Sequence, residues 1–511
     1  MLSMLTRIAI ALAALVVIDS VRFADPDLFV TLYSGREIVA HHGPPGVDTA
    51  SFTVAGRPWN DYEWLARVVF YELATAAGDR GLVVLRLVLA AAILATVVAV
   101  SMRGGGGAPS LATALALFTG AASGYLLFRP TLFTFLALVL LLTAVERFRQ
   151  GATWPLWAIP AAIPLWVNLH AGFALGVVLL GLLVTVGLAE RWIPVLGRTF
   201  SPGVPWTRSL PCFLASAALT GVHPLGYRQW SAILGTMGGT FTPSLSEWRP
   251  LIEFGFRETW PAYLLMVVLV VAMVVGRKRI AAFDVAAVLL LGAAAFVRVR
   301  FLPLFSLCAT LVLVRALPAL RETGLGRRFE TVREALPRFS RAAATLLAIL
   351  ALVVVAWRSG VPDLRIRKIP YLMPVSAVKF LQANGIAGRV LTEYDWGGYV
   401  RWKIPDATIF VDGRSDTVYP VAVIEDWARF VNALDGWRDT PARYGAQVVV
   451  LRREQSVVPL LEQEPGWIPA YSDPFASVFL RDGPENAAAI EALRAGRSVV
   501  PVVRLEDYLG L

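Results

Sequence analysis

Long apolar runs separated by arginine-rich loops constrain the fold of this chain more than any other feature. A helix needs about 20 apolar residues to cross a bilayer. Eleven runs reach or approach this length, and they lie near 4–21, 81–101, 110–128, 131–146, 155–168, 171–188, 209–222, 260–276, 281–297, 301–317 and 341–357. Only 16% of the residues are charged, against about 25% in soluble proteins. The pattern predicts a polytopic α-helical membrane protein with about eleven spans.

The basic loops predict how the chain is oriented, because cytoplasmic loops carry an excess of Lys and Arg. With the N-terminus inside, all the strongly basic loops fall on the cytoplasmic side; they contain Arg147 and Arg149, Arg191 and Arg198, 276–279, and 321–341. Residues 1–20 lack a small-residue cleavage site, so we expect an uncleaved first span. We therefore attribute the net charge of +10 to anchoring against anionic membrane lipids. The sequence lacks the interleaved basic and aromatic residues that would indicate a nucleic-acid partner.

The opposite side of the membrane receives most of the chemically capable residues. It contains the first loop (22–80), the loop 223–259 and everything after Trp357. All four histidines fall in these segments or at the tips of spans on this side, whereas the apolar runs carry almost no ionisable residue far from their ends. We therefore assign 1–358 to a transmembrane domain with an amphipathic first outer loop, and 359–511 to a domain outside the membrane.

The second domain has the pattern of a small α/β fold. Short apolar runs bounded by turn residues predict strands at 389–393, 408–411, 447–451 and 477–480. Two stretches predict helices at 374–384 and 422–434. The fold class is therefore a polytopic α-helical membrane protein with a C-terminal extracytoplasmic α/β domain.

The first candidate site is the pair Asp25 and Asp27, which directly follows the first span. Two neighbouring carboxylates can act as a general base and a partner that tunes it. They could also hold a divalent cation such as Mg²⁺ or Mn²⁺ through oxygen ligands. The alternative is a helix cap, because Asp-Pro is a frequent turn and capping signal. The two cysteines, Cys212 and Cys308, form no metal-binding or disulfide pattern.

The first loop and the second domain each carry another polar motif. In the first loop, Trp59 could stack on a sugar, and Asp48 and Glu63 could accept hydrogen bonds from its hydroxyl groups. The alternative is an amphipathic membrane anchor with ordinary turns. In the second domain the loop 412–416 has two acids and an arginine after a strand, which suits either substrate contact or a tight turn with an ion pair.

A third set of polar residues is scattered along the chain but falls on the same side of the membrane. Its members are Arg129, Asn168, His170, His223, Glu247, Arg298 and Arg300. Charged residues at span ends commonly extend to the interface as anchors. Together, however, three arginines fit a phosphate or pyrophosphate head group, because guanidinium groups bind phosphate oxygens in two-pronged fashion.

The order of these features resembles the membrane glycosyltransferases of the GT-C superfamily, which include protein O-mannosyltransferases and aminoarabinose transferases. The chain is most similar to a bacterial group with a D-x-D-L opening, a first loop with D-x-F-S-x-T-x-x-G-x-P-W, a W-x-N-x-H-G tip and a late W-G-G-Y…D-G-R. These motifs correspond to 25–28, 48–65, 166–172 and 396–414. The sequence departs from the group in two places. The group often has Trp and His after D-x-D-L, where this chain has Phe29, Val30 and Thr31, and Ala171 stands before Gly172 in the W-x-N-x-H-G tip.

The resemblance implies a mechanism. A polyprenyl-phosphate sugar would present its head group on the outer face, and Asp25 or Asp27 would deprotonate the acceptor hydroxyl. This hydroxyl would displace the lipid phosphate from the anomeric carbon with inversion. Asn168 and His170 would orient the head group. The residues that would stabilise the leaving phosphate are Arg129, Arg298 and Arg300.

The resemblance also implies a location and partners. We expect a bacterial inner membrane protein with a cytoplasmic N-terminus and a periplasmic C-terminal domain. Its partners would be a lipid-linked sugar donor and an envelope glycan, lipid or protein as acceptor. Two other interpretations are a non-catalytic scaffold of an envelope-polysaccharide assembly and a transporter of lipid-linked glycans, which would need ionisable residues buried in the middle of its spans.

Overall fold

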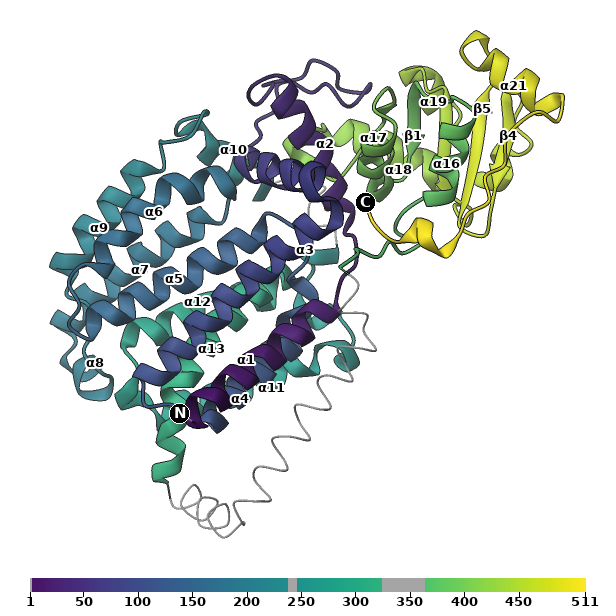
Figure 1. Cartoon of the computed structure of the whole chain (residues 1–511). Helices are drawn as coiled ribbons and strands as arrows, with labels where there is room; N and C mark the ends of the chain where they lie inside the picture. Colours follow the sequence, from purple (N-terminus) through teal and green to yellow (C-terminus); the bar gives the residue numbers. More distant parts are fainter. Residues whose placement is uncertain (1, 238–245, 324–363) are drawn as a thin grey trace, which may run out of the picture. The chain divides into compact units, whose positions relative to one another are not determined.

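The computed structural model describes residues 2–237, 246–323 and 364–511 (Figure 1). The predicted run at 341–357 and most of the basic stretch 321–341 lie outside the described residues. The chain forms two compact units. Unit 1 comprises 1–21, 84–227 and 244–364, and unit 2 comprises 22–83, 228–243 and 365–511.

Unit 1 is helical. Its helices are α1 (Leu2–Ser20), the second part of α3 (Trp64–Arg103), α4 (Ala108–Ala122), α5 (Thr131–Arg149), α6 (Pro155–Leu169), α7 (Phe173–Trp192), α8 (Pro194–Thr199), α9 (Trp206–Leu219), α11 (Phe256–Val275), α12 (Ala282–Val297) and α13 (Leu302–Ala316). Five helical segments among the described residues are long and apolar enough to cross a membrane, and they are Trp64–Arg103, Thr131–Arg149, Phe173–Trp192, Phe256–Val275 and Val299–Glu322. The chain is therefore a multi-pass membrane protein. Each predicted run in the described residues falls on a helix, although several of these helices are shorter than a full span.

Helix α6 contains two internal prolines, Pro160 and Pro164, which cannot donate a backbone hydrogen bond to the preceding turn. The carbonyl of Leu156, four residues before Pro160, instead accepts the thiol of Cys212 from α9, with a sulfur–oxygen distance of 3.3 Å. Cys212 is fully buried. This cysteine therefore satisfies a carbonyl that the helix itself leaves open.

Four charged residues form a buried network at one end of unit 1. Arg315 of α13 donates to Glu146 of α5 at 2.5 Å and to Asp284 of α12 at 2.8 Å. Arg149 also donates to Glu146 at 2.5 Å. Two guanidinium groups and two carboxylates compensate each other, as buried charges require. The network joins the last turns of α5 and α13 to the first turn of α12, so these helix ends lie on one side of the unit, as the predicted alternation of spans requires.

Arg86 is a buried arginine near the start of the predicted run 81–101. It lies within α3 and is only 1% exposed. Its guanidinium donates to the carbonyl of Ile18 at 2.5 Å and to that of Leu126 at 2.6 Å, and it packs over the ring of Phe128 at 5.0 Å. Sequence periodicity does not detect such a residue, because the carbonyls that bind it come from distant helix ends.

Unit 2 contains a five-stranded sheet in the order β2-β1-β3-β5-β4. The strands are β1 (Arg389–Thr392), β2 (Thr408–Ile409), β3 (Val448–Arg452), β4 (Trp467–Ser472) and β5 (Ala476–Arg481). The helices are α2 (Pro26–Ala40), the first part of α3, α10 (Arg228–Met237), α16 (Val375–Ala383), α17 (Gly397–Lys403), α18 (Val421–Val431), α19 (Asp439–Tyr444), α20 (Val458–Leu461) and α21 (Ala487–Arg494). The four predicted strands and two predicted helices of the C-terminal domain are confirmed to within a few residues, whereas β4, α17, α19, α20 and α21 were not predicted.

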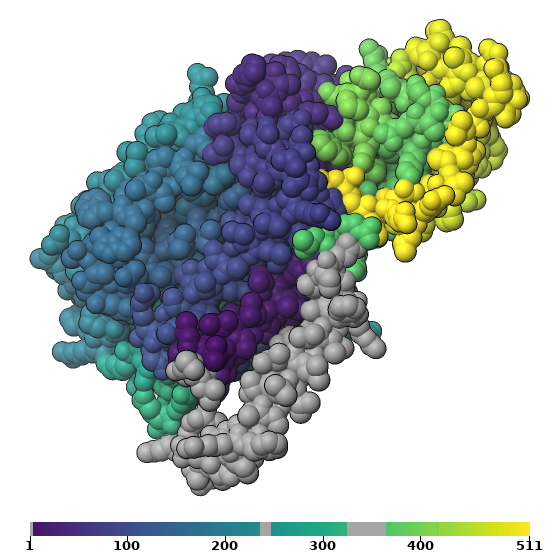
Figure 2. All heavy atoms as spheres, viewed as in Figure 1, coloured from purple at the N-terminus to yellow at the C-terminus, as the bar shows by residue number. Residues whose placement is uncertain are grey.

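The first loop packs with the C-terminal domain, although the sequence places it in the transmembrane domain. The backbone of Ile409 in β2 donates to Ala50 at 2.9 Å and accepts from Phe52 at 3.1 Å, so the first loop covers the edge of the sheet. Glu37 of α2 pairs with Arg401 of α17 at 2.8 Å. The space-filling view shows first-loop atoms, in purple, directly beside the green atoms of this domain (Figure 2).

Gly398 allows α2 and α17 to approach each other. A Cβ atom on Gly398 would lie 2.8 Å from Val30 Cγ2 and 3.0 Å from the backbone nitrogen of Val30. We expect Gly398→Ala to lower the free energy of unfolding by about 1–3 kcal/mol, because α2 must shift to admit the methyl group. The matched control is Gly235→Ala in α10, where nothing lies within 4 Å and alanine favours the helix. Thermal unfolding of the purified protein measures both, and equal melting temperatures for the two variants would contradict this packing.

Candidate functional site

Three arginines surround Glu247 and Trp248 in unit 1. Arg129 Nη1 lies 2.8 Å from Glu247 Oε2, and Arg300 Nη1 lies 3.6 Å from Glu247 Oε1. The guanidinium carbons of Arg298 and Arg300 lie 4.5 Å and 4.1 Å from the ring centre of Trp248. These contacts bring together four of the predicted site residues from distant parts of the sequence, which we call the arginine cluster: Arg129, Glu247, Arg298 and Arg300.

Local backbone structure presents the arginine cluster at helix ends. Arg129 immediately precedes Pro130 and the start of α5. Arg298 ends α12 in an extended conformation, and Arg300 lies in the short turn before α13. The side chains of Arg129 and Arg300 remain 24% and 32% exposed, so a ligand can reach them.

The arginine cluster has an excess of positive charge. Burial raises the pKa of Glu247, but Arg129 and Arg300 lower it by more, so the pKa lies below its ordinary value and the carboxylate stays ionised. Two guanidinium groups therefore contact one carboxylate, and a third, that of Arg298, lies over the neighbouring Trp248 ring. The Trp248 ring holds two of them by cation–π contact. This arrangement suits an anionic group such as a phosphate, which would accept the remaining donors.

His170 is held by a hydrogen-bonded relay that the sequence did not predict. Trp166 Nε1 donates to the Thr134 hydroxyl at 2.9 Å. That hydroxyl lies 2.8 Å from His170 Nδ1, and the backbone N–H of Gly172 also donates to Nδ1 at 2.8 Å. Since the N–H of Gly172 can only donate, Nδ1 is an acceptor, Thr134 donates to it, and the ring proton of His170 is assigned to Nε2.

Two glycines make this relay possible. A Cβ atom on Gly172 would lie 2.3 Å from the Thr134 hydroxyl oxygen, and one on Gly176 would lie 2.5 Å from the Trp166 ring. These contacts therefore explain why the tip between α6 and α7 contains Trp166, His170 and Gly172. No sequence motif points to Thr134, because it lies on α5, more than 30 residues before the tip.

Asn168 and His223 lie beside this relay on the same set of helix ends. The Asn168 amide donates to the carbonyls of Pro164 and Val222, each at 2.7 Å, and so joins the end of α6 to the loop after α9. His223 is buried, and its Nδ1 accepts the backbone N–H of Leu225 at 3.1 Å. These contacts position the loop, and the role of the two residues in binding a head group stays a prediction.

His170 should remain neutral over the physiological pH range. Burial, and then the charge of Arg300, lower its pKa to about 3, from about 6.5 in an unfolded chain. Between these values the unfolded chain binds a proton that the folded protein does not. Stability is therefore present above pH 6.5 and is lost as the pH falls toward 3, by up to about 1.4 kcal/mol per pH unit.

We predict that His170→Gln removes this contribution. The difference in melting temperature between pH 7.5 and pH 5 should be smaller in the variant than in the wild-type protein. His42→Asn is the control, because His42 is exposed at a position with positive φ, which asparagine tolerates. Identical pH dependence in the wild-type protein and His170→Gln would show that His170 is not held neutral.

The two first-loop acids have different roles in unit 2. Asp25 is the N-cap of α2: its Oδ1 accepts the backbone N–H of Asp27 at 2.9 Å, and the residue is 9% exposed. Asp27 lies in the first turn of α2 and is more exposed. Its Oδ1 is 2.5 Å from the position that a Cβ atom on Gly413 would occupy. The helix-cap interpretation of Asp25 is thus confirmed, and Asp27 packs closely against Gly413.

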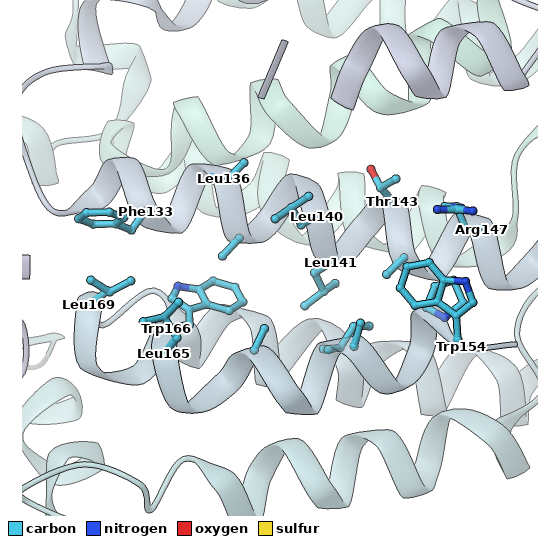
Figure 3. A pocket seen from close by; sticks show the side chains of 16 residues that line it. Phe133, Leu136, Leu140, Leu141, Thr143, Arg147, Trp154, Leu165, Trp166 and Leu169 are labelled. Carbon is cyan, nitrogen blue, oxygen red and sulfur yellow. The ribbon is translucent and has the colours of Figure 1, made fainter. Parts of the chain in front are cut away.

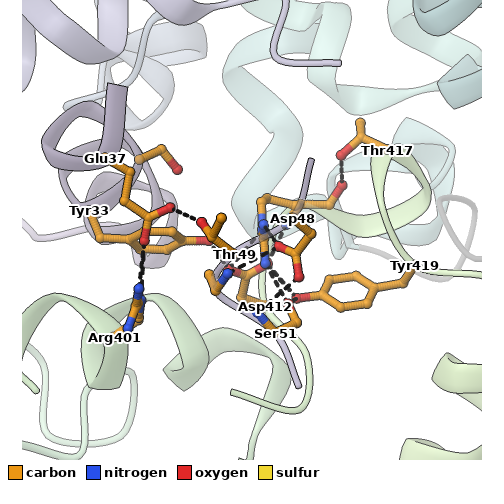
Figure 4. Close-up of polar contacts among 12 residues, drawn as sticks. Tyr33, Glu37, Asp48, Thr49, Ser51, Arg401, Asp412, Thr417 and Tyr419 are labelled. Carbon is orange, nitrogen blue, oxygen red and sulfur yellow. Dashed lines mark hydrogen bonds and ion pairs between the residues drawn. The ribbon is translucent and has the colours of Figure 1, made fainter. Parts of the chain in front are cut away.

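Arg414 organises a buried polar network in unit 2. Its Nε donates to Asp412 Oδ1 at 2.9 Å, and its Nη2 donates to Ser51 at 2.6 Å. Its Nη1 also pairs with Asp48. Asp48 and Ser51 of the first loop lie beside Asp412 of the late motif (Figure 4). Arg414 is 3% exposed. Burial would lower its pKa, but Asp412 and the other partners raise it far above its ordinary value, so it stays charged.

The predicted sugar-binding residues of the first loop lie around this network. Asp48 is 1% exposed and Trp59 is 3% exposed, and Arg414 lies 5.0 Å from the centre of the Trp59 ring. Glu63 is 4.0 Å from Arg67, which is also paired with Asp61 at 3.0 Å. The network explains the acid and the tryptophan of the first loop, because Asp48 and Trp59 both contact Arg414 of the late motif. Sugar binding by these residues stays a prediction.

Among the described residues, no group of three or more His, Cys, Asp or Glu side chains could hold a metal ion. Asp25 is engaged as a helix cap. We therefore derive no step through a metal ion.

Comparisons with solved structures identify the architecture. The archaeal oligosaccharyltransferase AglB from Archaeoglobus fulgidus, solved with an inhibitory peptide and a dolichol-phosphate, matches 92% of this chain and 73% of its own, with a TM-score of 0.54 and 12% identity. ArnT from Cupriavidus metallidurans bound to undecaprenyl phosphate matches 93% of this chain and 97% of its own, with a TM-score of 0.51 and 13% identity. The chain has a GT-C fold.

A third similar structure is the mycobacterial arabinofuranosyltransferase AftD, with a TM-score of 0.52 and 16% identity over 93% of this chain and 41% of AftD. All three proteins are GT-C glycosyltransferases. No sequence-family model and no curated protein matches the chain. At these identities the likeness establishes the fold, and activity has to be argued from the residues.

Proposed function

We propose that this protein is a glycosyltransferase that moves a sugar from a polyprenyl-phosphate donor to an envelope acceptor. The observation that carries the proposal is the arginine cluster, which has an excess of positive charge and lies at accessible helix ends of a GT-C fold. AglB and ArnT, which share this fold, were solved with dolichol-phosphate and undecaprenyl phosphate. An isoprenoid phosphate is the leaving group that such a cluster would bind.

In the proposed reaction the acceptor hydroxyl attacks the anomeric carbon and the lipid phosphate leaves with the bonding electrons, so the anomeric configuration inverts. Arg129, Arg298 and Arg300 offset the charge that develops on the phosphate oxygens, an effect worth several kcal/mol in a preorganised site. Glu247 holds two of these arginines in place before the donor binds. His170, with its proton on Nε2, is a neutral donor for a head-group oxygen.

Asp27 is the proposed general base. A carboxylate that accepts the hydroxyl proton as the bond to carbon forms makes the acceptor a stronger nucleophile. Asp25 fixes the start of α2 and so positions Asp27. The proposed location is the bacterial inner membrane, with the arginine cluster and the C-terminal domain on the periplasmic side.

The experiment is transfer by the purified protein in lipid nanodiscs, with radiolabelled polyprenyl-phosphate hexoses and an extract of envelope acceptors. We expect labelled acceptor with the wild-type protein, with inverted configuration at the anomeric carbon. The control is the double variant Asp25→Ala/Asp27→Ala, which should transfer no label. Equal transfer by the double variant would exclude the base assignment, and a retained configuration would exclude direct displacement.

A further inference from the structure

An apolar groove runs along α5 and α6 in unit 1. It has a volume of about 410 Å³ and is lined by residues of these two helices and the turn between them. Phe133 and Leu169 lie at one end, and Arg147 and Trp154 lie at the other (Figure 3). Arg147 lies fourteen positions after Phe133 on α5, so the groove is about 21 Å long. This length accommodates an extended hydrocarbon chain.

The chemistry of the lining is asymmetric. Among the described residues that line the groove, Arg147 alone is charged, and it lies at one end. Its guanidinium lies 5.3 Å from the centre of the Trp154 ring, and no carboxylate of the described residues pairs with it. Trp154 is 62% exposed, as expected of an interfacial tryptophan. Glu146 and Arg149, which are close to Arg147 in the sequence, belong to the buried charge network instead.

We propose that this groove binds one acyl chain of an anionic phospholipid whose phosphate pairs with Arg147. The charge of the lining selects this occupant, because its cation, Arg147, lies at the Trp154 end and the described residues of the opposite end are apolar. A lipid with its phosphate at the opposite end would leave Arg147 without a counterion. The test of this site does not use transfer activity.

Native mass spectrometry of the detergent-purified protein, titrated with phosphatidylglycerol or phosphatidylcholine, tests the proposal. The wild-type protein should retain one phosphatidylglycerol in preference to phosphatidylcholine. Arg147→Gln should weaken this retention about tenfold, the effect expected from losing one charge-assisted hydrogen bond. Arg191→Gln is the matched control, because Arg191 also stacks on a tryptophan, Trp192 at 5.9 Å, but does not line the groove.

A second variant tests the groove itself. Ala162 lines it with an exposed methyl group, so Ala162→Phe should fill it without disturbing the core and should lower retention while Arg147 is intact. Equal loss in the Arg147 and Arg191 variants would show only general attraction of anionic lipid and would overturn the proposal. Unchanged retention in Ala162→Phe, or displacement of phosphatidylglycerol by equimolar polyprenyl phosphate, would overturn it as well.

Discussion

Replacing Asp27 by asparagine should lower the rate of sugar transfer by roughly 10²–10⁴-fold, the usual contribution of a general base. Asparagine has nearly the same shape but cannot accept the proton of the attacking hydroxyl. Donor binding should change little, because the proposed role of Asp27 appears only in the transition state. Initial rates at saturating donor measure this effect, and unchanged melting would show that the variant is folded.

Asp25→Asn provides the matched control for this prediction. Asparagine is as good an N-cap as aspartate, so the variant keeps the hydrogen bond to the backbone of Asp27 and should retain most of its transfer rate. Asp25→Ala loses the cap and should be less stable by about 1 kcal/mol. If Asp25→Asn lost as much activity as Asp27→Asn, or if Asp27→Asn transferred at the wild-type rate, Asp27 would not be the base.

Replacing Arg414 by methionine should destabilise unit 2 by about 3–5 kcal/mol, because it leaves the carboxylates of Asp412 and Asp48 buried without their cation. Arg414→Lys should not restore stability, because a single ammonium group cannot reproduce the planar set of donors that reaches Asp412, Asp48 and Ser51. Thermal unfolding and limited proteolysis of the purified full chain measure the loss.

The matched control is Arg438→Met. Arg438 pairs with Glu464 at 2.8 Å but is 62% exposed, so its loss should cost about 1 kcal/mol or less. Equal melting temperatures for the Arg414 and Arg438 variants would contradict the view that the first loop and the late motif are held together by a buried charge network.

The helical part of the fold was largely predictable, because it depends on local composition. Long apolar runs and the alternation of basic loops predicted the helices and placed Arg129, Glu247 and Arg300 on one side, and the structure brings these three residues together. Strand β4 was missed because Pro469 interrupts its pattern. Proline is tolerated there because β4 is an edge strand with an irregular register.

The parts that were not predictable depend on contacts between distant residues. Thr134 and Arg86 lie on helices without a motif, and only the folded chain brings them to Trp166 or to the carbonyl of Ile18. The association of the first loop with the C-terminal domain rests on Asp48 and Arg414, which are 366 positions apart. Periodicity carries no signal at that separation.

Donor turnover shows whether the sugar leaves a lipid phosphate at the arginine cluster. Wild-type protein in nanodiscs, supplied with polyprenyl-phosphate hexose and acceptor, should release one polyprenyl phosphate for each sugar transferred. Arg129→Met/Arg300→Met should lose both products together while remaining folded. If the wild-type protein bound the donors but released no polyprenyl phosphate, the transferase account would be contradicted and a scaffold role favoured.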